Sequence, residues 1–106
     1  MDNTTIIQVS VTGMSSSANP CIFKTVVLKS HEDILMHLTE ADTKYVIKWI
    51  FDLNGRTLIV PPNCILDFDG GQIRNGSIIW SSTKVLNRYQ YEILENITES
   101  GERIDL

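Results

Sequence analysis

Residues 51–82 read FDLNGRTLIVPPNCILDFDGGQIRNGSIIWSS, a series of short apolar runs separated by turn-forming pairs. Asparagine and glycine tolerate the positive φ that a tight turn needs, and proline cannot donate a hydrogen bond to a strand ladder. Runs this short, with breaks this frequent, predict a chain that coils and stacks strand upon strand. The breaks that we predict to be structural turns are Asn54, Gly55, Pro61, Pro62, Gly70, Gly71, Asn75 and Gly76.

Alternation within these runs separates interior from exterior positions, because successive side chains of a strand point to opposite faces. The predicted interior residues are Leu66, Phe68, Ile73, Ile78 and Trp80. Asp67 and Asp69 fall between them and are expected to point outward into solvent. Gly70-Gly71 is interpreted as a tight corner at which glycine supplies backbone freedom. A β-meander, in which the Asn-Gly pairs close hairpins, remains an alternative to the coil.

The rest of the chain divides into three parts: 1–44, 45–87 and 88–106. The first part is predicted to be a docking module, with strands at 5–11 and 21–28, a small-residue loop at 12–20 and a short helix capped by Ser30. The second part holds the β-helix-like rungs. It opens with an apolar run, 46–53, that places Trp49 in the core. The third part is a C-terminal segment whose last residues are expected to fray unless a partner holds them.

Composition excludes several classes of function. The chain has 106 residues and a formal charge of −4, and its lysines and arginines are scattered singly, so nucleic-acid binding is not expected. No apolar run approaches the roughly 20 residues that span a bilayer, so no membrane span is predicted. The N-terminus does not read as a signal peptide. Cys21 and Cys64 are predicted to be buried free thiols rather than a disulfide.

The sequence predicts no catalytic residue, no cofactor and no metal ion, and therefore no enzyme. Asp67 and Asp69 share a strand face and form the best acidic pair, but a solvated outer face explains them better than a cation site. His31 and His37 lie six positions apart, not the three or four that align two ligands on a helix face. Tyr89 and Tyr91 lie beside Arg88 and are better interface candidates than Trp49 and Trp80, which are expected to lie in the core.

Residues 52–79, DLNGRTLIVPPNCILDFDGGQIRNGSII, resemble the opening rungs of pectate-lyase-like right-handed parallel β-helix proteins. Such segments occur in fibre and spike proteins of phages of gut bacteria, including crAss-like phages, and in polysaccharide-degrading proteins of their hosts. The resemblance covers roughly residues 50–101. It implies a mainly β fold, a short right-handed β-helix-like coil preceded by an N-terminal strand and helix module. Because the sequence stops at Leu106, we do not expect it to carry the activities that relatives have in later rungs.

A coil of two or three rungs leaves strand edges and apolar faces exposed at both ends, which favours association with partners. Three outcomes are expected to be open to it: side-by-side trimerisation, capping by the N-terminal strands and helix, or docking onto a larger assembly. We therefore expect a structural virion protein, a short phage fibre or fibre-base subunit, made in the host cytoplasm and anchored to other virion proteins at the head or tail. The resemblance implies a homotrimer first, and a host surface glycan is a further potential partner. The alternative is a carbohydrate-binding or polysaccharide-degrading β-helix segment. The interface candidates are Ile7, Val9, Val11, Arg88, Tyr89 and Tyr91.

Overall fold

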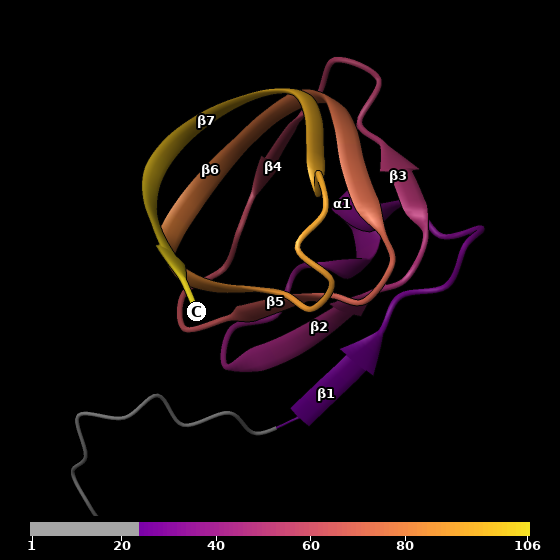
Figure 1. The fold of residues 1–106 in the computed structure, drawn as a ribbon. Coiled ribbons are helices and arrows are strands. Elements are labelled where there is room, and N and C mark those ends of the chain that lie inside the picture. Colours follow the sequence, from indigo (N-terminus) through magenta and orange to yellow (C-terminus); the bar gives the residue numbers. More distant parts are fainter. Residues whose placement is uncertain (1–23) are drawn as a thin grey trace, which may run out of the picture.

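The computed structural model describes residues 24–106, which form a β-solenoid of about 4 turns. The predicted mainly β fold class is confirmed (Figure 1). The predicted strand at 5–11, with Ile7, Val9 and Val11, and the loop at 12–20 lie outside the described residues. The elements are β1 (Lys24–Val27), α1 (Ile34–His37), β2 (Thr43–Ile47), β3 (Ile50–Asp52), β4 (Thr57–Ile59), β5 (Ile65–Phe68), β6 (Gln72–Asn87) and β7 (Leu94–Asp105).

Every strand pair in this part of the chain is parallel, with partners about one turn apart in sequence. Lys24 of β1 pairs with Thr43 of β2, and Lys44 of β2 pairs with Ile65 of β5. Ile65 then pairs with Lys84 of β6. Hairpins produce antiparallel ladders, so the parallel register excludes the β-meander.

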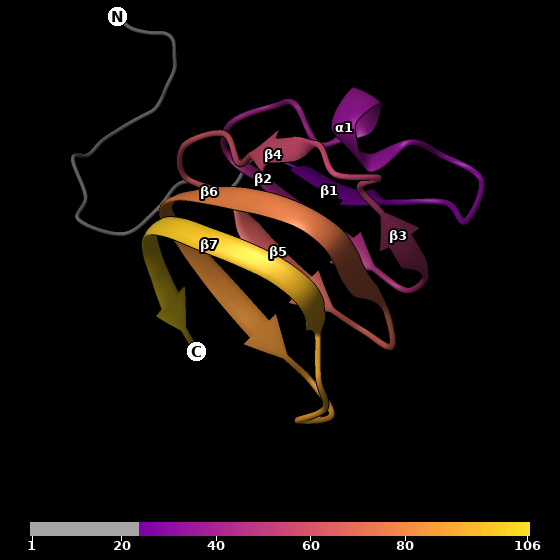
Figure 2. The ribbon, with the colours of Figure 1, turned by 90° about the horizontal axis from the view of Figure 1, so that it is seen from above.

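The turns share three faces. The first face holds β1, β2, β5 and the end of β6; the second holds β3 and the start of β6; the third holds β4 and the middle of β6. β7 pairs along β6 and so crosses all three faces. In Figures 1 and 2 the chain from β6 to β7 winds anticlockwise as it advances toward the viewer of Figure 1, which makes the coil right-handed.

The core consists of columns of inward side chains from successive turns. Tyr45, Leu66 and Val85 occupy one column, in the register of β2, β5 and β6. Leu58 and Ile78 stack in another on the third face. The predicted interior residues are all buried, which confirms the alternation: Leu66, Phe68, Ile73, Ile78 and Trp80. Each such side chain contributes about 1.5–3 kcal/mol by leaving water, so the columns hold the turns together.

Asparagines mark one corner of the coil at a constant spacing. Asn54, Asn75 and Asn96 have φ values of 54°, 62° and 55°, a left-handed conformation that asparagine tolerates better than most residues. The side chain of Asn96 donates to Asn75 Oδ1 at 3.0 Å, and Asn75 donates to Asp52 Oδ2 at 2.8 Å. Because the bonds run from turn to turn, this asparagine ladder fixes the stacking register at the corner between the second and third faces.

Glycines act at two corners in different ways. Gly70 has a φ of 97°, whereas Gly71, read in the sequence as a second source of backbone freedom, does not have a left-handed φ. A Cβ atom on Gly71 would lie 2.5 Å from the carbonyl oxygen of Ile47 and 2.6 Å from that of Trp49. Gly71 therefore permits close approach of two turns. Gly76 has the same role, since its Cβ would lie 2.5 Å from the Arg56 carbonyl oxygen.

The strands extend the coil beyond the predicted rungs in both directions. β1 lies before residue 45 and stacks on β2, which begins at Thr43, and β7 forms a turn within 88–106 where fraying was expected. The run 46–53 is not one strand: β2 ends at Ile47, the chain turns a corner, and Trp49 is 51% exposed rather than in the core. The corner restarts the alternation, so the face assigned to Trp49 was wrong.

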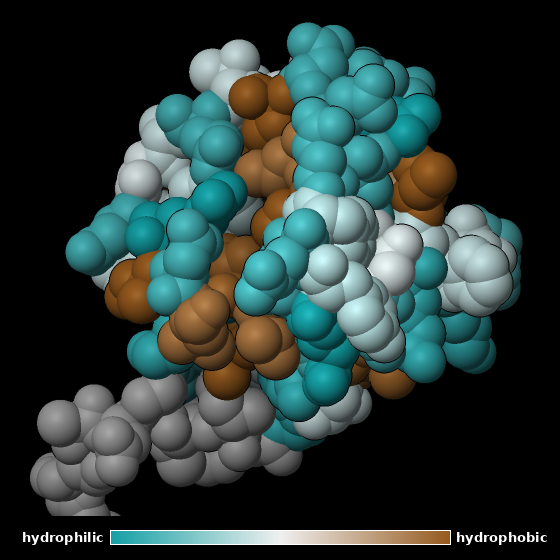
Figure 3. Space-filling view, viewed as in Figure 1, coloured by the Kyte–Doolittle hydropathy of each residue, from teal (hydrophilic) through white to brown (hydrophobic). Residues whose placement is uncertain are grey.

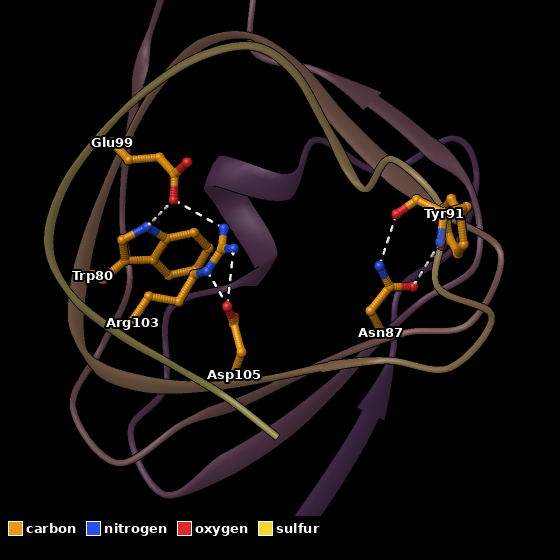
Figure 4. Close-up of polar contacts among 6 residues, drawn as sticks. All are labelled: Trp80, Asn87, Tyr91, Glu99, Arg103 and Asp105. Carbon is orange, nitrogen blue, oxygen red and sulfur yellow. Dashed lines mark hydrogen bonds and ion pairs between the residues drawn. The ribbon is translucent and has the colours of Figure 1, made fainter.

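α1 covers the end of the coil at which the described chain begins. It is capped by Asp33, whose side chain accepts a hydrogen bond from the Leu35 amide at 3.1 Å, and not by Ser30 as expected. Ile34 and Leu38 are buried in the common core. Figure 4 looks along the coil and shows α1 behind the opening formed by β6 and β7. This end is therefore capped by α1, which agrees with the expected outcome that the N-terminal helix covers an end of the coil.

Candidate interaction site

The opposite end of the coil is formed by β7, where charged residues take interior positions. Parallel pairing places Glu99 over Ile78, Arg103 over Thr83 and Asp105 over Val85. All three residues of the preceding turn are buried, with at most 2% exposure. Figure 4 shows the three charged side chains pointing across the opening. At these three positions the last turn thus has an acid–base–acid set, here called the end layer, in place of Ile78, Thr83 and Val85.

The end layer is bonded internally. Arg103 Nη1 lies 2.9 Å from Glu99 Oε1, and Arg103 Nε lies 2.8 Å from Asp105 Oδ1. Glu99 also accepts a hydrogen bond from the indole nitrogen of Trp80 at 2.9 Å, and the guanidinium lies 5.7 Å from the centre of the Trp80 ring. The hydrogen bond to Asp105 is the main cause of a raised pKa at Arg103. Gly101 lies directly over Trp80, where a Cβ would come within 2.1 Å of the tryptophan carbonyl oxygen.

A cavity of about 290 Å³ opens beside the end layer. Asn87 lies on its wall and holds the neighbouring loop, donating to the Tyr91 carbonyl oxygen at 2.7 Å and accepting from the Tyr91 amide at 3.3 Å. Figure 3 shows hydrophobic surface between hydrophilic side chains at this end. An apolar floor with a few polar groups is the usual character of a small-molecule pocket. The lining residues are Val85, Asn87, Tyr91, Ile93, Arg103, Asp105 and Leu106.

The predicted interface residues Arg88, Tyr89 and Tyr91 gather at the corner after the first face. Arg88 forms a two-point ion pair with Asp67, with both N–O distances at 2.8 Å. That contact overturns the prediction that Asp67 is solvated, since its side chain is only 1% exposed. Asp67 does point away from the core, but long side chains from neighbouring turns cover it, including Lys44 at 3.5 Å.

The two tyrosines differ in how much of the side chain is exposed to solvent. Tyr89 is 66% exposed and donates to Asp69 Oδ1 at 2.8 Å, which is the main cause of its raised pKa. Tyr91 is partly buried and donates to the Gly71 carbonyl oxygen at 2.5 Å; burial raises its pKa. The rings lie 6.5 Å apart. Tyr91 is therefore a brace between two turns, while Tyr89 remains available at the surface.

Among the described strands, the outer side of the third face carries no charged residue at 57–59, 77–79 or 98–100. Its outward positions form two rows across β4, β6 and β7, called here the neutral flank: Thr57, Ser77 and Thr98, and Ile59, Ile79 and Ser100. Ile59 is 63% exposed and Ile79 is 38% exposed. The outer sides of the other faces include charged residues such as Lys44, Lys84 and Arg74. A contact on the neutral flank would not require the desolvation of a charge.

A second hollow, of about 300 Å³, lies between α1 and the second face. The Arg56 guanidinium crosses it and bonds Asp33 Oδ2 at 2.8 Å, which lowers the pKa of that carboxyl. The pKa of Asp52 is also lowered, chiefly by the hydrogen bond from the Asn75 side chain. These carboxylates already have partners within the fold, Asp33 in a half-exposed ion pair and Asp52 in a hydrogen bond, so the hollow offers neither of them to a ligand.

The sequence reading missed the end layer and the asparagine ladder. The equal spacing of Asn54, Asn75 and Asn96 was the signal that could have revealed both, because 21 positions is the repeat at this corner. Advancing Ile78 by that repeat leads to Glu99, an acid at an interior position.

Within residues 24–106, no group of three or more histidine, cysteine or acidic side chains could hold a metal ion, and no helix has the length and apolar character of a membrane span. Cys64 is a buried free thiol, and burial raises its pKa.

No family model, curated protein or solved structure matches this chain.

Proposed function

We propose that this chain is a structural protein of a virus particle, a short phage fibre or fibre-base subunit that associates with copies of itself and anchors to the head or tail. The proposed role is not catalytic. The observation that supports it best is the right-handed parallel coil (Figures 1 and 2), which agrees in fold with the fibre segments that residues 50–101 resemble. Continuous ladders on three faces make a stiff unit, as a fibre requires.

The geometry favours side-by-side association over end-to-end stacking. α1 lies across one end and the end layer across the other, whereas the neutral flank is exposed. Three strands about 4.8 Å apart and about 10 Å long give this flank roughly 150 Å², well below the roughly 800 Å² per partner of a standard interface. We place the centre of the proposed trimer contact on this flank because its outward residues carry no charge to desolvate, and surrounding residues must supply the remaining area.

The test is the location of the protein in infected cells. Particles are purified through two density gradients, washed in high salt and assayed by quantitative mass spectrometry against a known capsid protein. The proposal predicts a constant copy ratio through both gradients, close to a multiple of three. Recovery of the protein only in the soluble lysate would contradict a virion role.

A second function, binding of a carbohydrate, is favoured by the cavity beside the end layer. Arg103, Asp105 and Asn87 can donate and accept hydrogen bonds there, while Val85 and Ile93 supply apolar surface. Two carboxylates surround one guanidinium, so an anionic sugar is disfavoured and a neutral one fits better. Calorimetric titration with neutral mono- and disaccharides tests this function, and Asn87→Ala should weaken any binding observed. The absence of heat at millimolar sugar with the folded protein would exclude it.

A further inference from the structure

We propose that the end layer is a built-in stop that prevents a second copy of this chain from stacking on β7. Among the described strands, β7 pairs only with β6, so its other edge faces outward. An exposed strand edge of 12 residues is a template for pairing with another chain. Inward-pointing charges are one of the ways in which proteins block such pairing.

The cost of stacking arises from the positions of the three charges. A further turn or a second β7 laid on this end would cover Glu99, Arg103 and Asp105, whose side chains are now 42%, 28% and 64% exposed. Two carboxylates and one guanidinium carry a net negative charge, and two such layers would face each other across a two-fold contact. Covering them removes water from every charge and brings like charges together.

The layer also explains why Trp80 remains buried at an open end. Trp80 is only 3% exposed because Gly101 and the Arg103 guanidinium lie over it. Arg103 thus covers the top of the apolar column with a group that stays hydrated on its outer side. The stop consequently protects the core while leaving no apolar surface over Trp80 for a partner.

The test restores the preceding turn's residues in the triple variant Glu99→Ile, Arg103→Thr, Asp105→Val, which copies Ile78, Thr83 and Val85. The matched control is Glu102→Val, which changes the net charge by the same +1 at an exposed position. Light scattering with size-exclusion chromatography is run from 1 to 200 µM. We expect the triple variant to double the mass of the wild-type species, since two β7 edges can pair about a two-fold axis, and the control to keep the wild-type mass.

A folded triple variant with the wild-type mass at every concentration would overturn the proposal. If circular dichroism shows that the triple variant is unfolded, the same measurement is made on the single variant Asp105→Val, which keeps the contacts of Arg103 with Glu99 and Trp80. This variant should show a doubled mass in the upper part of the concentration range, and an unchanged mass there would also refute the stop. The result does not depend on whether the protein belongs to a virion.

Discussion

Replacement of Gly71 by alanine tests the close stacking of two turns. The new Cβ would lie 2.5 Å from the Ile47 carbonyl oxygen, against an ordinary contact of at least 3.4 Å, so the turns must separate by roughly 0.9 Å. The backbone bonds Gly71 N–Ile47 O and Gln72 N–Trp49 O, at 3.0 and 3.1 Å, cross the same gap. Loss of both at about 1 kcal/mol each, with about 1–3 kcal/mol of strain, predicts a loss of roughly 3–5 kcal/mol.

Gly55→Ala is the matched control because it isolates backbone strain from crowding. Gly55 has a φ of 80° and nothing within 4 Å of the position a Cβ would take. Its replacement should cost only about 1–2 kcal/mol, the penalty of a left-handed conformation. Urea unfolding followed by circular dichroism measures both. A Gly71→Ala loss no larger than that of Gly55→Ala would refute the inferred stacking distance.

Three further predictions concern charge and association. Arg88→Ala should lower the urea midpoint of unfolding more than Lys48→Ala, because only Arg88 is the main partner of a buried carboxylate, Asp67. Equal effects of the two substitutions would show that the Arg88–Asp67 ion pair does not stabilise the fold. The lowered pKa of Asp52 stabilises the fold above its ordinary value of 3.8, and this contribution is lost as the pH falls through the lower folded value. Unfolding in urea at pH 5 and pH 2.5 should therefore show a smaller loss for Asp52→Asn than for the wild type, whereas equal losses would contradict the assignment. Ile79→Lys on the neutral flank should reduce the mass that light scattering gives for the proposed trimer. Ile50→Lys is the control, because Ile50 is exposed on another face, and it should leave the mass unchanged. If both variants dissociate, or neither does, the neutral flank is not part of the contact.

Local signals in the sequence account for the coil and most of its core. Asn54 and Asn75 occupy left-handed corners because their conformational preference is intrinsic. Ile73 and Ile78 are both interior because alternation holds within each short run, on either side of the corner at Asn75. Trp49 was misassigned because a corner between two short strands restarted the alternation. Such a corner carries no glycine or proline, so nothing local marks it.

The burial of Asp67 and the end layer depend on the contacts between turns. Arg88, the ion-pair partner of Asp67, lies 21 positions further along the chain. From the local sequence LDFD alone, alternation predicts that the Asp67 carboxylate points outward into solvent. Glu99, Arg103 and Asp105 read as an exposed strand or a fraying tail, because charged residues are rarely interior. Only the register of β7 on β6 assigns them to the interior. α1 covers one end of the coil, whereas at the other end the charged end layer lies over the core and the edge of β7 stays unpaired among the described strands.

The most direct test of this account is a nuclear Overhauser measurement on the uniformly labelled protein. Parallel stacking predicts cross-strand contacts from Leu58 to Ile78 and from Ile78 to Glu99, together with contacts between the Trp80 ring and the Arg103 side chain. The pattern must be that of a parallel ladder, with partners one turn apart in sequence on all three faces. Strong Hα–Hα contacts, which mark antiparallel pairs, would contradict the coil. A Trp80 ring without Arg103 contacts would contradict the end layer.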